Sequence, residues 1–217
     1  MKSVVKNQRA GDNDLLSSKR SRTNTNNILI CCSGSVAGIK IPLIVNQLRS
    51  YDKLEVQIVA TENGIKFLDL DLLRDVKVWK DEDEWKDWNK VSDPILHIEL
   101  RRWADMILIC PCSANTLAKI SNGICDNLLT SLIRASNPNE IPIYIFPSMN
   151  TMMYENPITK LQLENLKQNL NFKTLGPITK KLACGDTGIG AMTEWKDVVQ
   201  IVVERFQLKL RSTHNLC

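Results

Sequence analysis

The stretch KKLACGDTGIGAM, residues 180–192, places a thiol beside a concentration of glycine. The whole chain has nine glycines, and three of them follow Cys184 within the next six residues, at Gly185, Gly188 and Gly190. A cysteine can act as a nucleophile or exchange a proton with a bound molecule, and glycines let a loop fold closely over a ligand. The pattern therefore indicates either a thiol carried on a closing loop or an ordinary tight turn beside a buried cysteine.

Two further side chains could do chemistry with such a thiol. His97, in SDPILHIEL, is the only histidine outside the last few residues, since His214 lies near the C-terminus. An imidazole transfers protons near neutral pH, although a lone histidine can equally be structural. Asn150 stands among three methionines in PSMNTMMY, where its amide needs hydrogen-bond partners. Those partners could come from the protein or from a ligand, and the sequence leaves both open.

The elements that must position these residues follow from short apolar runs that alternate with helix-like segments. Strands are predicted at 27–32, 56–60, 106–111 and 141–147, with a less clear one at 76–79. Helices are predicted at 36–49, from Ser113 to 120, at 157–168 and at 198–206, and Pro42 must lie early in the first or kink it. Strands that are apolar throughout and alternate with helices are typical of a parallel sheet covered on both faces. We therefore predict a single three-layer α/β domain.

Ligands of open parallel sheets bind beyond the carboxyl ends of the strands. The segment after the first predicted strand, SGSVAG, has Gly34 for a tight turn and Ser35 as a hydroxyl donor. It is not GxGxxG, so a mononucleotide such as FMN fits better than a dinucleotide. The third strand is followed by PCSANT, where Ser113 could be an ordinary helix N-cap. The fourth is followed by the segment of Asn150.

Charge and hydropathy limit the classes of partner. The first 26 residues hold six Lys/Arg and two Asp/Glu, a surplus that equals the net charge of +4 for the whole chain. We predict a disordered basic arm at 1–26, the folded domain at 27–207 and a short polar tail at 208–217. The neutral body argues against nucleic-acid binding. No apolar run approaches the ~20 residues of a membrane span, and the arm lacks a secretory h-region.

The expected location is therefore the cytoplasm. The KRSR run at 19–22 could be a solubilising feature, a nuclear signal or a weak transit feature. Seven cysteines without a disulfide-framework spacing fit a reducing compartment, with the pair in NILICC and Cys110 as buried core residues. We expect no metal site, because two histidines and one CxC pattern do not supply a ligand set. Three tryptophans in and beside DEDEWKDW are interpreted as packing residues of a helix, against the sheet edge or a neighbouring subunit: Trp79, Trp85 and Trp88.

Five stretches together carry a resemblance that covers residues from about Asn27 to Phe206. They are GSVAGIKIPLIVNQL, SDPILHIELRRWADMILICP, SANTLAKISNGICDNLLT, PSMNTMMYENPIT and KKLACGDTGIGAM. In this ordered set the chain resembles the homo-oligomeric flavin-containing cysteine decarboxylases, and among them the phosphopantothenoylcysteine decarboxylases. The resemblance implies a flavodoxin-like, Rossmann-type fold, FMN as cofactor, and a homotrimer with active sites at subunit interfaces.

The resemblance also implies roles for individual residues. His97 matches the catalytic histidine of the LHIxL motif, Asn150 matches the asparagine that holds the substrate carboxylate, and Cys184 matches a proton donor in the ACGD loop. Tyr154 stands where the asparagine's motif ends in Trp. The implied cofactor-binding residues are Gly34, Ser35, Val36, Thr61, Ser113, Ala114, Asn115, Thr116 and Met149. The implied substrate-binding residues are Asn150, Lys181, Ala183 and Met192.

The implied carboxy-lyase reaction turns 4′-phospho-N-pantothenoyl-L-cysteine into 4′-phosphopantetheine, on the route to coenzyme A. The CH2–SH group is oxidised to a thioaldehyde, CO2 leaves, and the enethiolate is reduced; without the oxidation, loss of CO2 would leave an unstabilised carbanion. One alternative is a non-catalytic regulatory subunit that acts on a protein phosphatase, which can lack one of the three catalytic groups. The other is a peptidyl-cysteine decarboxylase, which would stop at the enethiol and would not need Cys184.

Overall fold

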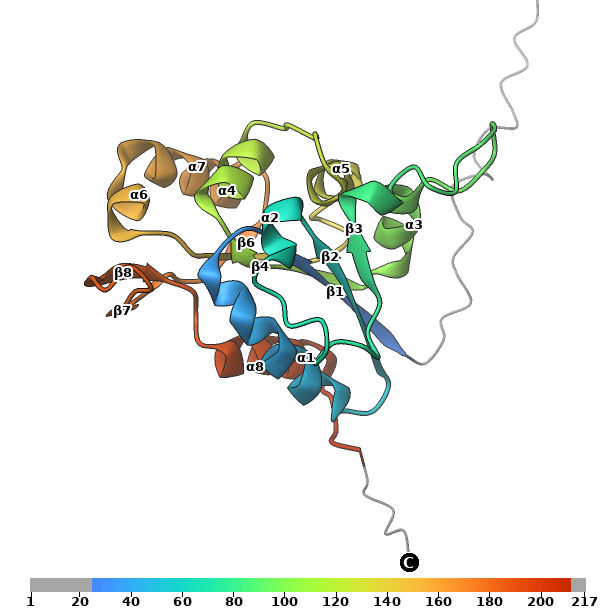
Figure 1. The fold of residues 1–217 in the computed structure, drawn as a ribbon, viewed down its shortest axis with the longest axis horizontal. Coiled ribbons are helices and arrows are strands. Elements are labelled where there is room, and N and C mark those ends of the chain that lie inside the picture. The colour runs from blue at the N-terminus through green and yellow to red at the C-terminus, as the bar shows by residue number, and fades with distance from the viewer. Residues whose placement is uncertain (1–24, 212–217) are drawn as a thin grey trace, which may run out of the picture.

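The structure is a computed structural model that describes residues 25–211. Figure 1 shows one central sheet with helices on both of its faces. The arm predicted at 1–26 lies outside the described residues except for its last two positions, and Asn26 already belongs to the first strand. The predicted tail is described as far as Arg211. None of the helices in residues 25–211 has the length and apolar character that crossing a bilayer requires.

The central sheet of the described chain is parallel, with strand order β3-β2-β1-β4-β5-β6. The strands are β1 (Asn26–Cys32), β2 (Leu54–Ala60), β3 (Val78–Lys80), β4 (Met106–Cys112), β5 (Ile143–Pro147) and β6 (Lys173–Thr174). This is the doubly wound order, which confirms the predicted Rossmann-type sheet. The chain leaves β1 and β4 toward opposite edges, so the crevice beyond their carboxyl ends is the topological switch point where such sheets bind ligands.

Helices cover both faces of the sheet (Figure 1). One face holds α1 (Ile41–Arg49) and α8 (Trp195–Phe206); the other holds α3 (Leu96–Trp103), α4 (Ala114–Ser121), α5 (Leu128–Ala135) and α7 (Pro157–Gln168). The side chains of β1 alternate between the two layers: Ile28 and Ile30 pack with α1 and α8, whereas Leu29 packs with the opposite helices. Burial on both faces explains why the strands are apolar throughout, and each buried aliphatic side chain contributes roughly 1.5–3 kcal/mol.

The helix starts follow local sequence signals. The segment 36–49 begins as a 3-10 turn, η1 (Val36–Lys40), and continues as α1 with Pro42 in its first turn, where the missing N–H costs nothing. Ser113 is the N-cap of α4, as predicted, because its hydroxyl accepts a hydrogen bond from the Thr116 N–H. α7 begins at Pro157, also as predicted. A short helix, α6 (Thr151–Glu155), precedes it, and α2 (Glu62–Ile65) follows β2.

The glycine-rich stretch is a β-hairpin and not an irregular loop. Its strands are β7 (Ile178–Lys181) and β8 (Thr187–Ala191), and Cys184 lies exposed in the turn between them. Gly185 has φ +95°, which strongly favours glycine. At Gly190 the carbonyl oxygen of Met149 lies where a side chain would begin. The hairpin therefore packs directly on the segment that follows β5, and the interpretation as a turn beside a buried thiol is wrong.

The acidic stretch 81–88 contradicts the helix expected there. It forms a short 3-10 turn, η2 (Asp81–Asp83), followed by further turns, because the Asp83 carboxylate accepts a hydrogen bond from the Lys80 N–H and fixes a tight bend. Trp85 and Trp88 are 56% and 42% exposed and contact each other edge to face. Trp79, in β3, is the half-buried one and packs against the core.

Candidate active site

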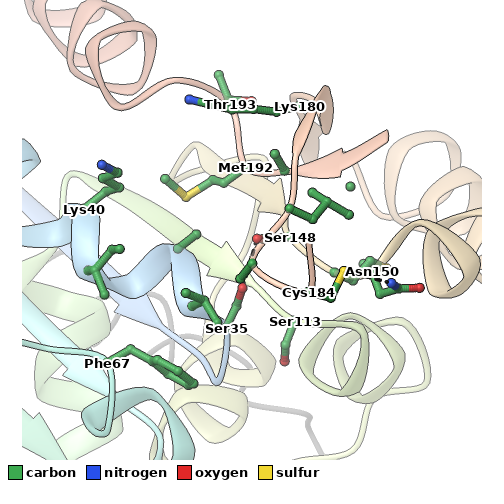
Figure 2. A pocket seen from close by; sticks show the side chains of 18 of the residues that line it. Ser35, Lys40, Phe67, Ser113, Ser148, Asn150, Lys180, Cys184, Met192 and Thr193 are labelled. Carbon is green, nitrogen blue, oxygen red and sulfur yellow. Dashed lines mark hydrogen bonds between the residues drawn. The ribbon is translucent and has the colours of Figure 1, made fainter. Parts of the chain in front are cut away.

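A cavity of about 460 Å³ opens at the carboxyl ends of β1, β4 and β5 (Figure 2). Its walls come from the segment after β1, the start of α4, the segment after β5 and the hairpin β7–β8. The position is the switch point of the sheet, and the volume is typical of small-molecule sites. The sequence predicted a ligand at these strand ends.

Ser33 joins the two strands on either side of the switch point. Its hydroxyl donates a hydrogen bond to the Pro111 carbonyl at 2.8 Å and accepts one from the Ser113 N–H at 2.8 Å, and the side chain is fully buried. This bridge fixes the start of α4 relative to the end of β1. No motif of the sequence pointed to Ser33, whose only signal was its place directly after the first apolar strand.

Polar groups converge on the floor of the cavity. The hydroxyls of Ser35 and Ser148 lie 2.9 Å apart, and Ser113 begins α4, whose first N–H groups favour an anion such as a phosphate. Gly34 leaves room for the close approach of Asn63, since an added Cβ would lie 2.7 Å from the Asn63 Cβ. The predicted cofactor residues that line the cavity are Gly34, Ser35, Val36, Ser113, Ala114 and Met149.

The other three predicted cofactor residues do not line this cavity. Thr61 is the N-cap of α2, where its Oγ1 accepts a hydrogen bond from the Gly64 N–H at 3.0 Å, and it lines a separate cavity of about 370 Å³ beyond β2. Thr116 is buried within the cap of α4, and Asn115 is exposed in the first turn of that helix. The PCSANT motif correctly predicted where α4 begins. It did not show which side chains of that first turn face the cavity.

Asn150 and Cys184 meet at one end of the cavity (Figure 2). Asn150 is the N-cap of α6: its Oδ1 accepts a hydrogen bond from the Met152 N–H at 2.8 Å, and its Nδ2 lies 3.6 Å from the Cys184 Sγ. Since the cap occupies the oxygen, the amide presents its NH2 group, a donor, toward the thiol. The Cys184 thiol in turn lies 3.4 Å from the Asp186 carboxylate.

The cavity carries an excess of positive charge. Lys40, Lys180 and Lys181 line it, and Lys180 forms an ion pair with Glu194 at 2.7 Å. The surplus cations favour an anionic ligand. Figure 2 shows Lys40 and Phe67 across the cavity from Asn150 and Cys184. Neither Lys40 nor Phe67 belongs to a motif from which a ligand site was predicted. The predicted substrate residues Lys181, Ala183 and Met192 all line the cavity.

His97 lies elsewhere on the same chain. It belongs to the first turn of α3, where its Nδ1 is 2.8 Å from the Glu84 Oε1, and it is not among the residues that line the cavity of Asn150 and Cys184. A single chain therefore brings together two of the three predicted catalytic side chains. The spacing of the three motifs gives no signal for this separation, and only the family resemblance, which implies active sites at subunit interfaces, leads one to expect it.

The cysteines of the described chain are all free and fall into two classes. Burial raises the pKa of four thiols, that of Cys32 to about 12, and leaves them as inert core residues: Cys31, Cys32, Cys110 and Cys112. Cys125 and Cys184 are exposed. Within residues 25–211 no group of three or more histidine, cysteine or acidic residues is placed to hold a metal ion.

Comparison with known proteins finds a family and several relatives that cover most of this chain. The family described as Flavoprotein matches residues 16–207. A phosphopantothenoylcysteine decarboxylase of Arabidopsis thaliana is 49% identical over 168 residues, which cover 77% of this chain and 78% of the relative. A probable thymidylate synthase of Schizosaccharomyces pombe is 46% identical over 202 residues, 91% of this chain, but the match spans only 32% of that longer relative.

Solved structures give the same result. A cysteine mutant of a PPC decarboxylase, in complex with pantothenoylaminoethenethiol, superposes with a TM-score of 0.80 at 44% identity, covering 84% of this chain and 99% of the other. The FMN binding protein AtHal3 superposes with a TM-score of 0.76 at 45% identity, covering 84% and 97%.

Proposed function

The chain belongs to the Flavoprotein family, within which it groups with the phosphopantothenoylcysteine decarboxylases, and from this premise we propose that it converts 4′-phospho-N-pantothenoyl-L-cysteine to 4′-phosphopantetheine with FMN as cofactor. The observation that carries the proposal is the convergence of the Asn150 amide and the Cys184 thiol in a positively charged cavity at the switch point of the sheet. An oxidisable cysteine substrate that bears a carboxylate and a phosphate matches that combination of groups.

The residues of the cavity floor fit a flavin mononucleotide. The Ser35 and Ser148 hydroxyls and the start of α4 offer donors for phosphate and ribityl oxygens, while Val36, Ala114 and Met149 offer apolar surface for a ring system. When bound, FMN supplies the oxidation of the substrate CH2–SH group and the later reduction that completes the product. The protein supplies binding, orientation and protons.

Asn150 holds the substrate carboxylate in this proposal. The Asn150 oxygen caps α6, and this hydrogen bond leaves the NH2 group facing the cavity. The NH2 group is therefore oriented as a donor before substrate binds. A carboxylate held this way keeps the bond to the departing CO2 in one orientation relative to the sulfur-bearing carbon. The cations of the same cavity, including Lys40 and Lys181, attract the two anionic groups of the substrate.

Cys184 donates the proton that completes the saturated product. Its place at the exposed turn of the β7–β8 hairpin puts the thiol next to Asn150, at the position where the reacting carbon would lie if Asn150 binds the carboxylate. The hairpin rests on the backbone after β5 through the hydrogen bond from the Met149 N–H to the Gly190 carbonyl, at 3.0 Å. It therefore covers the bound substrate and excludes water from it.

His97 reaches the site from a neighbouring subunit. We propose a homotrimer in which α3 of one chain faces the cavity of the next, since His97 does not line the cavity of its own chain. Neither His97→Asn nor Cys184→Ser should form 4′-phosphopantetheine alone. Mixing the two variants, after subunit exchange, should restore part of its formation, because some interfaces then combine an intact imidazole with an intact thiol. No recovery in mixed trimers, checked by mass, would contradict shared sites.

The decisive assay compares two substrates with the FMN-loaded protein. Phosphopantothenoylcysteine should give CO2 and 4′-phosphopantetheine in equal amounts, and a peptide that ends in cysteine should react far more slowly. Faster decarboxylation of the peptide, with an enethiol as product, would favour a peptidyl-cysteine decarboxylase. A flavin-bound protein that decarboxylates neither would favour a regulatory subunit. We place the reaction in the cytoplasm, in keeping with the free thiols of the described chain.

A further inference from the structure

Glu84 is the only charged residue that is buried within residues 25–211, at 8% exposure. It belongs to the acidic stretch DEDEWKDW, to which the proposed reaction gives no role. Removing an ionised carboxylate from water is costly unless hydrogen bonds or a partner charge compensate for it. The contacts of the Glu84 side chain therefore indicate why a carboxylate is buried at this position.

The contact of the Glu84 side chain is with His97. The Glu84 Oε1 lies 2.8 Å from the His97 Nδ1, and the two side chains are 9% and 19% exposed. An ionised carboxylate only accepts hydrogen bonds, so in the neutral imidazole Nδ1 carries the hydrogen and Nε2 keeps its lone pair. The Trp85 ring lies edge-on to the imidazole, with 6.3 Å between centroids. No hydrogen bond to Nε2 is found in the described part of the chain.

The rest of the acidic stretch anchors Glu84. The two carboxylate oxygens of Asp81 accept hydrogen bonds from the Leu128 N–H, at the start of α5, and the Glu62 N–H, at the start of α2. Negative charge is favourable at both helix starts. The Asp81 carbonyl then accepts a hydrogen bond from the Glu84 N–H at 3.2 Å. The backbone of Glu84 is thus tied to two helices, and its carboxylate is held over the first turn of α3.

We propose that Glu84 is a positioning residue for His97: it fixes the imidazole as the Nδ1–H tautomer, so that Nε2 is the atom that exchanges a proton with substrate, and it stabilises the imidazolium formed when Nε2 takes that proton. The proposal rests on the proposed function, in which His97 exchanges a proton with the substrate during the oxidative decarboxylation. The same logic operates wherever a carboxylate orients a histidine base. A purely structural ion pair would hold α3 in place but would not require a particular tautomer.

Nitrogen NMR of the imidazole tests the tautomer without any turnover. The chain has two histidines, so a His214→Gln variant leaves the signals of His97 alone. At a pH where the ring is neutral, we expect a protonated Nδ1 and an unprotonated Nε2 in the FMN-loaded protein. In the same background, Glu84→Leu should move the ring toward the Nε2–H tautomer. A neutral His97 that already carries its hydrogen on Nε2 when Glu84 is present would overturn the proposal.

Kinetics test the consequence for the reaction. Glu84→Gln keeps the shape and an acceptor oxygen of the side chain but removes its charge. We expect kcat to fall about 10- to 100-fold while KM stays within about threefold, because part of the rate enhancement from a positioned proton-transfer group is lost. The matched control is Glu82→Gln, at an exposed neighbour whose ion-pair partner is Lys80 and not His97, and it should keep wild-type kcat. Full kcat in Glu84→Gln, or a loss that only follows a lowered melting temperature and flavin content, would refute the assignment.

The two experiments separate this proposal from the proposed function. If the wild-type protein releases no CO2 from phosphopantothenoylcysteine, the proposed function fails, whereas the NMR result still decides whether Glu84 sets the tautomer. If the wild type is active and Glu84→Gln is too, the proposed function stands and the role of Glu84 falls.

Discussion

Asn150 offers the sharpest test of the site because the oxygen and the NH2 group of its amide have different roles that substitutions can separate. The oxygen caps α6 by accepting a hydrogen bond from the Met152 N–H, and the NH2 group faces the Cys184 thiol in the cavity. Asn150→Asp preserves the cap of α6, since a carboxylate oxygen is an equally good cap. It abolishes hydrogen-bond donation into the cavity, since a carboxylate cannot donate. Asn150→Ala removes both.

The magnitudes follow from the two losses. A hydrogen bond to a charged group is worth about 1.5–3 kcal/mol, so Asn150→Ala should lower kcat/KM about 10- to 150-fold. In Asn150→Asp the new charge also repels the substrate carboxylate; about 4 kcal/mol at 4 Å in partly screened surroundings brings the expected loss to about 10⁴- to 10⁵-fold. Stability should show the reverse order, with about 1 kcal/mol lost in the alanine variant and almost none in the aspartate variant.

The control is a second asparagine cap in the same region. Asn156 caps α7 by accepting a hydrogen bond from the Ile158 N–H at 3.0 Å and does not line the cavity. Asn156→Asp should leave kcat/KM unchanged. The assay is CO2 release with flavin content and urea unfolding measured on each protein. An Asn150→Asp variant that is folded, holds FMN and stays within tenfold of wild-type kcat/KM would refute the carboxylate-binding role.

The remaining predictions concern thiols. Cys184→Ser should still release CO2 but accumulate the unsaturated product, seen by mass spectrometry; full conversion to 4′-phosphopantetheine would remove Cys184 from the mechanism. Because burial raises the pKa of the core thiols, that of Cys32 to about 12, their contribution to stability is complete below the pKa of an unfolded thiol, ~8.5, and is lost as pH rises from there toward about 12. Between about pH 8 and pH 10, urea unfolding should show a loss of about 2 kcal/mol in the free energy of unfolding for each such thiol. The loss in Cys32→Ala should be smaller by about 2 kcal/mol; an equal loss in that variant and wild type would contradict the prediction.

The layered sheet could be predicted because its signals are local. The strand at 106–111 is apolar at every position, and it is fully buried in β4. The helix at 157–168 starts at a proline and has leucines at helical spacing, and α7 has the predicted bounds. In both cases the residues of the segment itself predict its structure and its burial, without any contact to a distant part of the chain.

The parts that were missed depend on distant contacts. The hairpin has no alternating apolar pattern, since β7 reads ITKK and is mostly exposed, and its glycines fit against Met149 and Thr151, which are far away in sequence. Helix α3 is only eight residues long and three of those residues are charged, so no long apolar segment marks it in the sequence. The bridging role of Ser33 comes from a contact 78 residues away, with Pro111.

The candidate site shows the same division. The motifs located Asn150 and Cys184, which the structure brings within 3.6 Å. They did not show that His97 lies outside the cavity of its own chain, because a motif carries no information on how far apart the fold places its residues. They also gave no role to Glu84, whose partner is fixed only when η2 packs over α3.

The most direct test of FMN-dependent decarboxylation is CO2 release from phosphopantothenoylcysteine by one protein sample in three states: as purified with FMN, after removal of FMN, and after FMN is restored. We predict release in the first state, none in the second although the protein stays folded, and recovery in the third in proportion to the FMN bound. Release from the folded, FMN-free protein, or no release from a protein saturated with FMN, would contradict the account.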